Sequence, residues 1–126
     1  MTKAGKILRS RRSAERRGRR SEALAAFLLT CKFYRILARR VRTHAGEIDL
    51  VALSPSGIVC FIEVKARHES DAAALALGAR QQARIARAAE LYLAQRPGLR
   101  SKGVRFDTVM VAHRRWPRHV RDAWRP

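Results

Sequence analysis

The sequence predicts an α/β fold in one domain, with a mixed sheet flanked by helices. The chain has 126 residues, of which 47% are hydrophobic, enough for one core but not for two domains. Two short apolar runs are joined by a turn that contains Pro and Gly, which is typical of a β-hairpin. A stretch with the apolar periodicity of an α-helix then separates this hairpin from a further strand. The strand-helix-strand order favours a crossover connection, so part of the sheet should be parallel.

The charge balance points to an anionic partner. The chain carries 28 Lys and Arg against 10 Asp and Glu, a formal net charge of +18. Such a charge repels itself in the compact state, and nucleic acid is its commonest partner. An anionic membrane is disfavoured, because the chain has neither a long basic amphipathic helix nor an apolar run of spanning length. Composition does not separate DNA from RNA, so a ribosome-associated or RNA-processing protein also fits it.

The chain is expected to begin with a disordered basic arm, residues 1–12. A single domain should follow over residues 13–112. A helix should start near Ser13, whose hydroxyl can cap it, and end near Cys31. Its apolar positions follow the i, i+3, i+4, i+7 rule at Leu24, Phe27, Leu28 and Cys31.

Glu22 on this helix has two interpretations. Its carboxylate could flank the buried stripe and act as a third acidic group of a site, or it could be an ordinary surface residue paired with Arg16 or Arg19.

A first strand is expected from Phe33 to Val41, with Tyr34, Ile36 and Ala38 on one side. Cations follow it and would lie where a phosphate backbone passes; the nucleic-acid-binding candidates are Arg39, Arg40, Arg42, His44, Arg67 and Arg84.

The hairpin runs from Ile48 to Leu53 and from Ile58 to Ala66, with its turn at residues 54–57. Side chains alternate along a strand, so Val59, Phe61, Glu63 and Lys65 share one face. Folding about the turn brings Asp49 roughly opposite Glu63.

A half-buried pair of carboxylates repels itself and loses hydration, and a divalent cation would relieve both effects. Mg²⁺ or Mn²⁺ favours oxygen ligands, which Asp49, Glu63 and the Val64 carbonyl could supply. Lys65 could polarise a water or stabilise charge on a phosphate. An Asp followed on the next strand by Glu-x-Lys is the pattern of PD-(D/E)xK nucleases, although Glu-Val-Lys is also an ordinary strand tripeptide.

A second helix is expected from Ala79 to Gln95, with Gln82 near its N-terminal end, and a strand from Arg105 to Ala112. Residues 113–126 should form a basic tail outside the domain. Its indoles, Trp116 and Trp124, could stack on nucleobases or could anchor the tail to the core; the pattern favours neither. Cys31 and Cys60 lack ligand spacing and are expected to be reduced, consistent with a cytoplasmic protein.

The element Gly46-Glu47-Ile48-Asp49-Leu50, joined to Glu63-Val64-Lys65, resembles the YraN family of bacterial endonuclease-like proteins, distantly similar to archaeal Holliday junction resolvases. The resemblance implies a restriction-endonuclease-like fold, with Asp49, Glu63 and Lys65 as the catalytic core. Glu22 matches an auxiliary position on the first helix, and Gln82 matches one on the second. Arg40 stands where the family often has Asn, and Gln81 where it commonly has Lys; both differences concern substrate handling.

The activity expected from this resemblance is Mg²⁺- or Mn²⁺-dependent hydrolysis of DNA phosphodiester bonds, in branched or structured DNA. A non-catalytic nucleic-acid-binding module is the alternative. Cutting two strands, as a resolvase does, would require two copies, so a homodimer is a further expectation.

Overall fold

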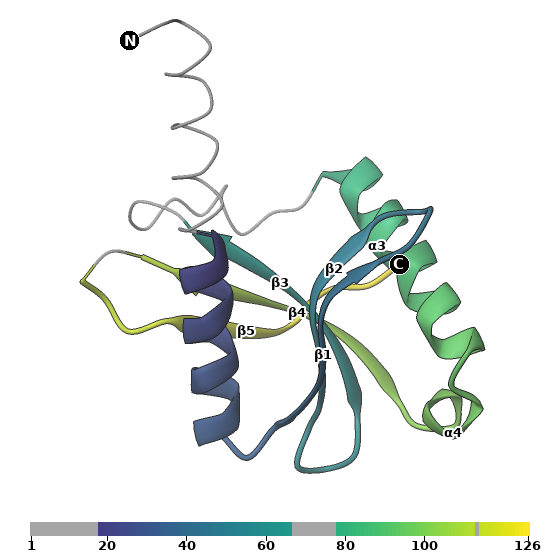
Figure 1. Cartoon of the computed structure of the whole chain (residues 1–126), viewed down its shortest axis with the longest axis horizontal. Helices are drawn as coiled ribbons and strands as arrows, with labels where there is room; N and C mark the ends of the chain where they lie inside the picture. Colours follow the sequence, from purple (N-terminus) through teal and green to yellow (C-terminus); the bar gives the residue numbers. More distant parts are fainter. Residues whose placement is uncertain (1–17, 67–77, 113) are drawn as a thin grey trace, which may run out of the picture.

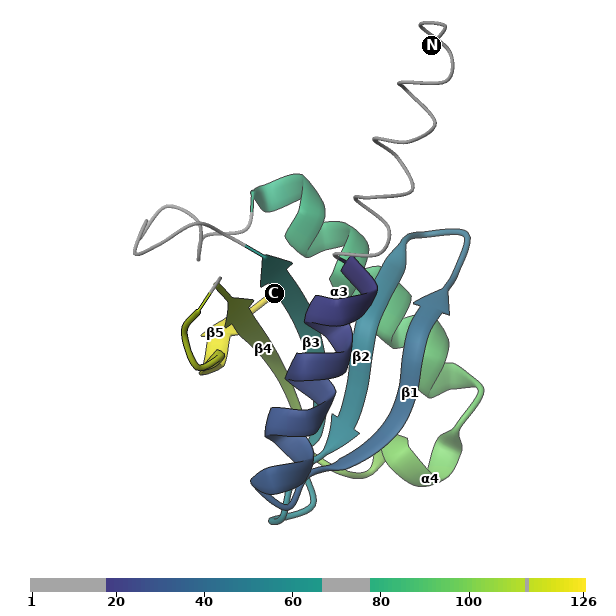
Figure 2. The same ribbon diagram turned by 60° about the vertical axis from the view of Figure 1, so that its left-hand side comes forward.

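A computed structural model describes residues 18–66, 78–112 and 114–126. They form one five-stranded sheet in the order β1-β2-β3-β4-β5. A helix over residues 18–31 covers one face of the sheet, and α3 (Ala79–Ala94) covers the other (Figures 1 and 2). A short helix, α4 (Pro97–Arg100), follows α3. The predicted α/β class, a mixed sheet flanked by helices, is confirmed.

The five strands are β1 (Arg35–Arg42), β2 (Glu47–Leu53), β3 (Val59–Ala66), β4 (Val104–Val111) and β5 (Arg118–Trp124). Strands β1, β2 and β3 form an antiparallel meander, and β4 pairs antiparallel with β5. Between them, β3 and β4 are parallel, with α3 in the connection. The predicted parallel crossover is therefore confirmed.

The β2–β3 turn forms as its composition predicts. The Ser54 backbone N–H donates to the Ile58 carbonyl at 2.8 Å, and the Ser54 hydroxyl accepts the Ile58 N–H at 2.9 Å. Gly57 has φ of +90°, a backbone conformation that residues with side chains rarely adopt. The turn residues thus fix the register of the hairpin.

The core lies in two layers, one on each face of the sheet. Cys60 and Ile62 of β3 pack toward the helix of residues 18–31, whereas Val59 and Phe61 pack toward α3. The predicted alternation along β3 is confirmed, and it places Glu63, the next residue of the second set, on the α3 face.

The buried stripe predicted for the first helix is wrong at three of its four positions. Leu24, Phe27 and Cys31 are exposed, and the sheet is contacted by Leu28 together with Ala25, Ala26 and Leu29. Small side chains let the helix axis approach the sheet closely, which the larger Leu24 and Phe27 would prevent. The helix offers two apolar stripes, and periodicity does not choose between them.

Strand β1 also differs from its prediction. The β1–β2 register shifts between Ile36 and Ala38, so that Tyr34 and Ile36 pack in one core layer and Ala38 in the other. An irregularity of this kind breaks strict alternation. The expected common face of Tyr34, Ile36 and Ala38 is therefore wrong.

Residues 118–124, which the sequence analysis assigned to a tail outside the domain, form β5 and belong to the sheet. Its polar sequence hid this strand, since His119 and the Asp122 backbone N–H bind the buried Asp107 carboxylate. Residues 1–12, the expected helix start at Ser13, and Arg67 lie outside the described residues. Within the described ranges no helix has the length and apolar character needed to cross a membrane.

Candidate active site

Asp49 of β2 and Glu63 of β3 face each other on adjoining strands. The β2–β3 register ends with the pair Leu50 and Ile62, the residues next to Asp49 and Glu63 in the sequence. The two carboxyl groups share a hydrogen bond, and Asp49 Oδ2 also accepts the Val64 backbone N–H at 2.8 Å. The juxtaposition expected from the sequence is therefore present.

The local sequence holds Asp49 at this position. Its neighbours Ile48 and Leu50 are 1% and 0% exposed and pack in opposite core layers. Because apolar side chains fix the strand on both sides, the carboxylate cannot rotate into solvent without disturbing the core.

Burial and mutual repulsion both disfavour ionisation of this pair. Burial raises the pKa of Asp49, with the charges of Glu22 and Glu47 adding to the effect, although the Val64 N–H opposes it. Burial also raises the pKa of Glu63, and the Asp49 charge raises it further. A hydrogen bond between two carboxyl groups requires one shared proton, so the pair titrates as a unit with a raised pKa.

Lys65 lies on the same face of β3, two residues after Glu63. It is only 8% exposed, which is rare for a lysine that lacks a partner charge. Its positive charge lowers the pKa of Glu63, opposing burial. The site thus combines two carboxyl groups with an ammonium group.

Thr108 of β4 is a site residue that the sequence analysis missed. In the parallel β3–β4 register it pairs with Glu63, so the two side chains lie on the same face. It is 0% exposed, and its Oγ1 has no hydrogen-bond partner within the part of the chain that the structure describes. A buried hydroxyl without a partner is unfavourable, and a bound ion, water or substrate oxygen would satisfy it. No motif marks Thr108; only the strand register places it here.

Glu22 pairs with a residue from a distant element. Its Oε2 accepts a hydrogen bond from Arg40 Nε at 2.6 Å, which joins the first helix to β1. Arg40 has φ of +49°, consistent with a side chain directed by this contact. Glu22 still raises the pKa of Asp49 through its charge. It therefore stands near the pair, and its carboxylate is engaged by an arginine from β1; Arg16, one of its expected partners, lies outside the described residues.

The amide that contacts Glu63 comes from Gln81. Its Nε2 donates to Glu63 Oε1 at 3.1 Å. Gln82, the expected auxiliary residue, lies one position further along α3 and is half-buried. One residue turns a helix by about 100°, so the two amides point in different directions.

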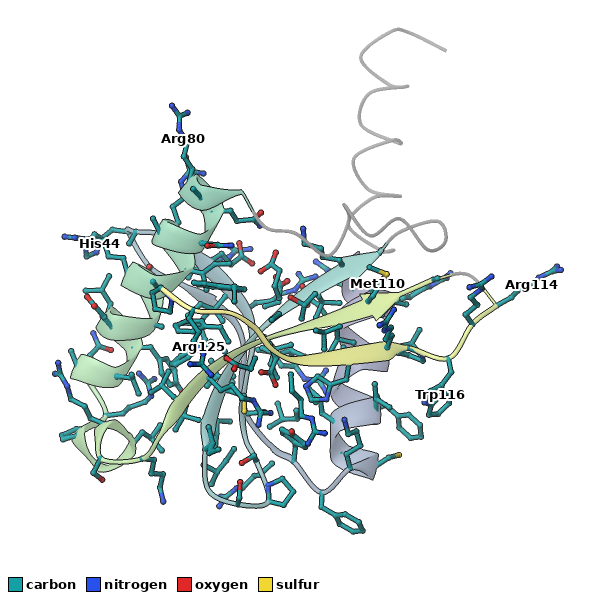
Figure 3. The ribbon with its side chains drawn as sticks, turned by 180° about the vertical axis from the view of Figure 1, so that it is seen from behind. His44, Arg80, Met110, Arg114, Trp116 and Arg125 are labelled. Atoms are coloured by element: carbon teal, nitrogen blue, oxygen red, sulfur yellow. The ribbon has the colours of Figure 1, made fainter. Side chains whose placement is uncertain are left out.

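The predicted cations lie around this end of the sheet. Arg39 and Arg42 are exposed on β1, and His44 is exposed in the β1–β2 turn. A Cβ at Gly46 would lie 3.3 Å from the Arg84 Cβ, so this turn packs closely against α3. In Figure 3, Arg80 points away from the N-terminal end of α3, and His44 lies in the turn beside this helix.

The donor set is suited to a divalent cation with few protein ligands. Within the described residues, no group of three His, Cys, Asp or Glu side chains converges to hold a metal. Asp49 and Glu63 supply two carboxylates whose repulsion a cation would remove, and the Thr108 hydroxyl lies in the same row. Mg²⁺ commonly binds through one or two carboxylates together with water and substrate phosphate. The residues present therefore fit such an ion.

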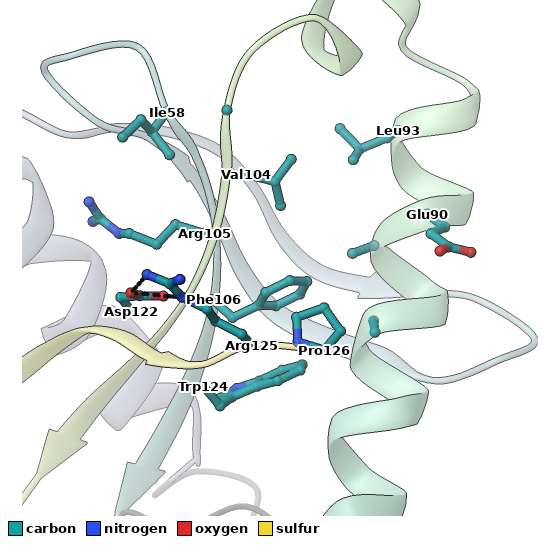
Figure 4. A pocket seen from close by; sticks show the side chains of 13 residues that line it. Ile58, Glu90, Leu93, Val104, Arg105, Phe106, Asp122, Trp124, Arg125 and Pro126 are labelled. Carbon is teal, nitrogen blue, oxygen red and sulfur yellow. Dashed lines mark hydrogen bonds and ion pairs between the residues drawn. The ribbon is translucent and has the colours of Figure 1, made fainter.

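An open pocket of about 650 Å³ lies elsewhere, between α3 and the N-terminal half of β4 (Figure 4). Phe106 and Trp124, stacked at 4.3 Å, form part of its wall, and an Arg125–Asp122 ion pair of 2.7 Å lies at its edge. None of the site residues lines it. Its charged lining residues include Arg125 and Asp122, which pair with each other, and Arg105, which pairs with Asp107, so the carboxylate site is the stronger candidate.

A second buried carboxylate, Asp107 of β4, is fully paired. It accepts two hydrogen bonds of 2.8 Å from Arg105, one of 2.8 Å from His119 Nε2 and one of 3.0 Å from the Asp122 N–H. Burial alone would raise the pKa of Asp107, but the His119 and Arg105 hydrogen bonds outweigh it and lower the pKa to about 2. Asp107 therefore anchors β5 to β4.

The sheet, its two covering helices and the acidic pair on adjoining strands define a single-domain α/β protein of restriction-endonuclease-like architecture. The model of a family described as "Uncharacterised protein family UPF0102" matches residues 21–111. The chain belongs to this family, which is the YraN family that its motifs resemble.

Relatives of similar length support this assignment. A UPF0102 protein of Parvibaculum lavamentivorans is 52% identical over 114 residues, covering 90% of this chain and 85% of the relative. One from Maricaulis maris is 50% identical over 120 residues, covering 95% and 94%. One from Paramagnetospirillum magneticum is 49% identical over 121 residues, covering 93% of each. Their names state a family and no activity.

Proposed function

We propose that this protein is a metal-dependent endonuclease that hydrolyses phosphodiester bonds in nucleic acid, DNA in the first place. The observation that carries the proposal is the paired carboxyl groups of Asp49 and Glu63, with the buried Lys65 on the same face. The repulsion within this pair has no structural benefit in the free protein, whereas it provides two ligands for a cation.

Each residue has a separate task in this proposal. Asp49 and Glu63 would hold Mg²⁺ or Mn²⁺, which when bound supplies Lewis-acid activation of the scissile phosphate and of the attacking water. Lys65 orients that water and stabilises negative charge on the phosphate. Gln81 holds the Glu63 carboxylate in position through their hydrogen bond.

Two further residues act through their neighbours. Glu22 keeps Arg40 beside the site and adds negative charge near Asp49. Gln82 stays a proposed contact for water or substrate from the start of α3.

Cation binding is coupled to proton release. Since the two carboxyl groups share one proton in their hydrogen bond, a metal must displace that proton before both carboxylates can bind it. The affinity for Mg²⁺ or Mn²⁺ should therefore rise with pH through the raised pKa values of the pair.

The substrate would approach over the cationic end of the sheet. Four exposed cations are proposed to guide it: Arg39 and Arg42 on β1, His44 in the β1–β2 turn and Arg84 on α3. Each phosphate that they contact releases a condensed counterion, so binding should weaken steeply with salt.

The test is cleavage by purified protein with Mn²⁺ of a panel of linear, single-stranded, flapped and four-way DNA. Wild type should cut at least one of these substrates only when the metal is present. Asp49→Ala and Lys65→Ala should each lower the rate by about 100-fold or more. Lys102→Ala, an exposed lysine in the loop before β4, is the matched control and should cut normally. Equal cutting by Asp49→Ala and wild type would refute the proposal.

A non-catalytic nucleic-acid-binding protein is the second candidate. It is favoured by the Glu22–Arg40 ion pair, which engages one of the expected acidic ligands. Calorimetric titration with Mg²⁺ and Mn²⁺ separates the two functions. Heat of binding that disappears in Asp49→Ala supports the enzyme, and its absence in wild type supports the binding protein.

A further inference from the structure

We propose that Trp116 and the arginines beside it form a stacking site for the unpaired bases of single-stranded nucleic acid, next to the acidic pair. This inference rests on the proposed function, because it takes the substrate to be nucleic acid. It adds that the substrate has unpaired bases. A strand with exposed bases would leave the carboxylate site along the β4–β5 turn.

The two tryptophans have different surroundings. Trp124 stacks on Phe106, with ring centroids 4.3 Å apart and an interplanar angle of 30°. Trp116 is 70% exposed, and no aromatic ring stacks on it among the residues described. Trp124 therefore anchors β5, whereas Trp116 presents its ring to solvent. The two roles that the sequence left open are divided between the two residues.

The strand register connects this turn with the acidic site. Lys65 pairs with Met110, and Met110 pairs with Arg118, so the three residues form one row across β3, β4 and β5. Neighbouring strands lie about 4.8 Å apart, which places Arg118 about 10 Å from Lys65 between backbones. In-register neighbours share a face, so Arg118 lies on the same side of the sheet as Lys65 and Glu63.

The turn extends beyond this row. Arg114 and Trp116 lie at the outer end of the β4–β5 connection and point away from the sheet, with Met110 near the end of β4 (Figure 3). The step from Lys65 to Arg118 alone corresponds to about three nucleotides, at 3.4 Å or more per stacked base, and Trp116 lies further along the same strand of nucleic acid. Trp116 can thus contact the same strand as the catalytic residues.

The turn is built to hold the indole in place. Pro117, which directly follows Trp116, is buried. A residue before proline is confined to extended conformations, so the Trp116 backbone has little freedom. Less ordering is then needed when a base stacks on it.

The chemistry of the patch favours nucleic acid with unpaired bases. Exposed arginines accompany the indole at positions 114, 115 and 118, and guanidinium groups suit phosphates. An indole face stacks on any base, but in a duplex the base faces are covered by their neighbours. The combination therefore fits a single strand or a flap better than uniform duplex.

The experiment measures binding in EDTA, so that no cleavage is required. Oligo(dT) is titrated into the protein at low salt, and tryptophan fluorescence and anisotropy of a labelled strand are followed. We expect the strand to quench wild-type fluorescence, and Trp116→Ala to lose most of that quenching. Trp116→Ala should weaken oligo(dT) binding about tenfold, while duplex binding changes less than about twofold.

Two controls test the specificity of this result. Phe33→Ala removes an aromatic ring that is 84% exposed in the connection between the first helix and β1, outside the β4–β5 turn, and it should leave oligo(dT) affinity unchanged. Arg114→Ala should weaken single-strand and duplex binding alike and reduce the salt dependence by about one counterion.

Unchanged oligo(dT) affinity in Trp116→Ala would overturn the inference, and a changed sedimentation coefficient in that variant would assign the surface to a protein contact instead. The proposed function fails separately. If Trp116→Ala weakens strand binding but wild type cuts nothing with Mn²⁺, the stacking site stands and the enzyme does not. If wild type cuts with Mn²⁺ and Trp116→Ala binds oligo(dT) normally, the enzyme stands and the stacking site does not.

Discussion

The pKa shifts of the two acidic clusters, Asp107 and the Asp49–Glu63 pair, have opposite directions. Asp107 is 0% exposed and receives four hydrogen bonds, which lower its pKa to about 2. Asp49 and Glu63 repel each other at the end of the neighbouring strands, and burial raises the pKa of both. One cluster is complete within the protein, whereas the other would be completed by a cation.

This difference separates a structural role from a functional one. A carboxylate whose lone pairs are all engaged by protein donors stabilises the fold and has no capacity left for a ligand. A pair held together against its own repulsion is maintained by the surrounding core, and such strain is typical of binding sites. The Thr108 hydroxyl, buried without a partner in the described part of the chain and beside Glu63, belongs to the second cluster.

The largest effect expected is the loss of the Asp107 anchor. Asp107→Asn should lower the free energy of unfolding by about 3–5 kcal/mol, because Arg105 and the buried His119 lose their anionic partner. Urea unfolding at pH 7 measures it. Asp49→Asn, the matched change in the other cluster, should cost less than about 1 kcal/mol, since the amide oxygen can still accept the Val64 N–H. Equal losses in the two variants would remove the distinction between the clusters.

The pH dependence of stability should have opposite signs at the two clusters. Asp107 has a lowered pKa, so its contribution is present above its ordinary value of 3.8 and is lost as the pH falls toward about 2. Glu63 has a raised pKa, so the folded state holds more protons and stability falls as the pH rises above 4.5. Glu63→Gln should abolish this second decline and be more stable than wild type at pH 8 by at least about 1.4 kcal/mol, equivalent to one pKa unit.

Denaturation curves of both proteins at pH 5 and pH 8 measure this effect. The side-chain amide introduced by Glu63→Gln keeps an oxygen that can accept the hydrogen bond from Gln81, so that contact does not confound the comparison. A wild-type protein equally stable at both values would show that the pair carries little repulsion.

Binding of a divalent metal should offset the repulsion within the acidic pair and raise the free energy of unfolding. At a Mn²⁺ concentration ten times its dissociation constant, wild type should gain about 1.4 kcal/mol of stability at pH 8. The gain should shrink at pH 6, where protons compete for the same oxygens. Thermal melts with and without Mn²⁺ measure it, with Asp49→Asn as the control that gains nothing. An equal gain in that variant would place the ion elsewhere.

The smallest effect concerns a single hydroxyl. Thr108→Val should raise the stability of the metal-free protein by about 1 kcal/mol, because it replaces a buried hydroxyl that has no partner among the described residues with a methyl group. Thr43→Val is the matched contrast and should lower it by a similar amount, since the Thr43 hydroxyl accepts the Gly46 N–H and donates to the Gly46 carbonyl. Guanidinium unfolding compares both with wild type. Destabilisation by Thr108→Val would indicate a protein partner for this hydroxyl.

The fold was predictable where local chemistry and the pattern of burial agree. The β2–β3 hairpin follows from its turn and its alternation, and the parallel crossover follows from the order of elements. The face of the first helix that packs on the sheet was not predictable, because Leu24 and Phe27 form as good a periodic pattern as the alanines that face the sheet. Strand β5 was missed because His119 faces a carboxylate instead of the apolar core.

The acidic pair was also predictable, since Asp49 and Glu63 meet through a short hairpin whose register the turn fixes. Contacts between residues far apart in the sequence were not predictable. Thr108 lies beside Glu63 through the parallel pairing of β3 and β4, which are joined by α3, and Arg40 of β1 contacts Glu22 of the first helix. The contact of Gln81 with Glu63 also depends on how α3 docks on the sheet, which no local pattern specifies.

The same parallel pairing has a consequence for the order of folding. The hairpin that joins Leu53 to Val59 closes locally, an event of microseconds, whereas Val59 meets Val104 only after the intervening helix has formed and docked. The two acids therefore come together early, and the hydroxyl, the last strand and its exposed indole arrive late. A partly folded chain would present a nascent cation site before it can hold a strand of nucleic acid.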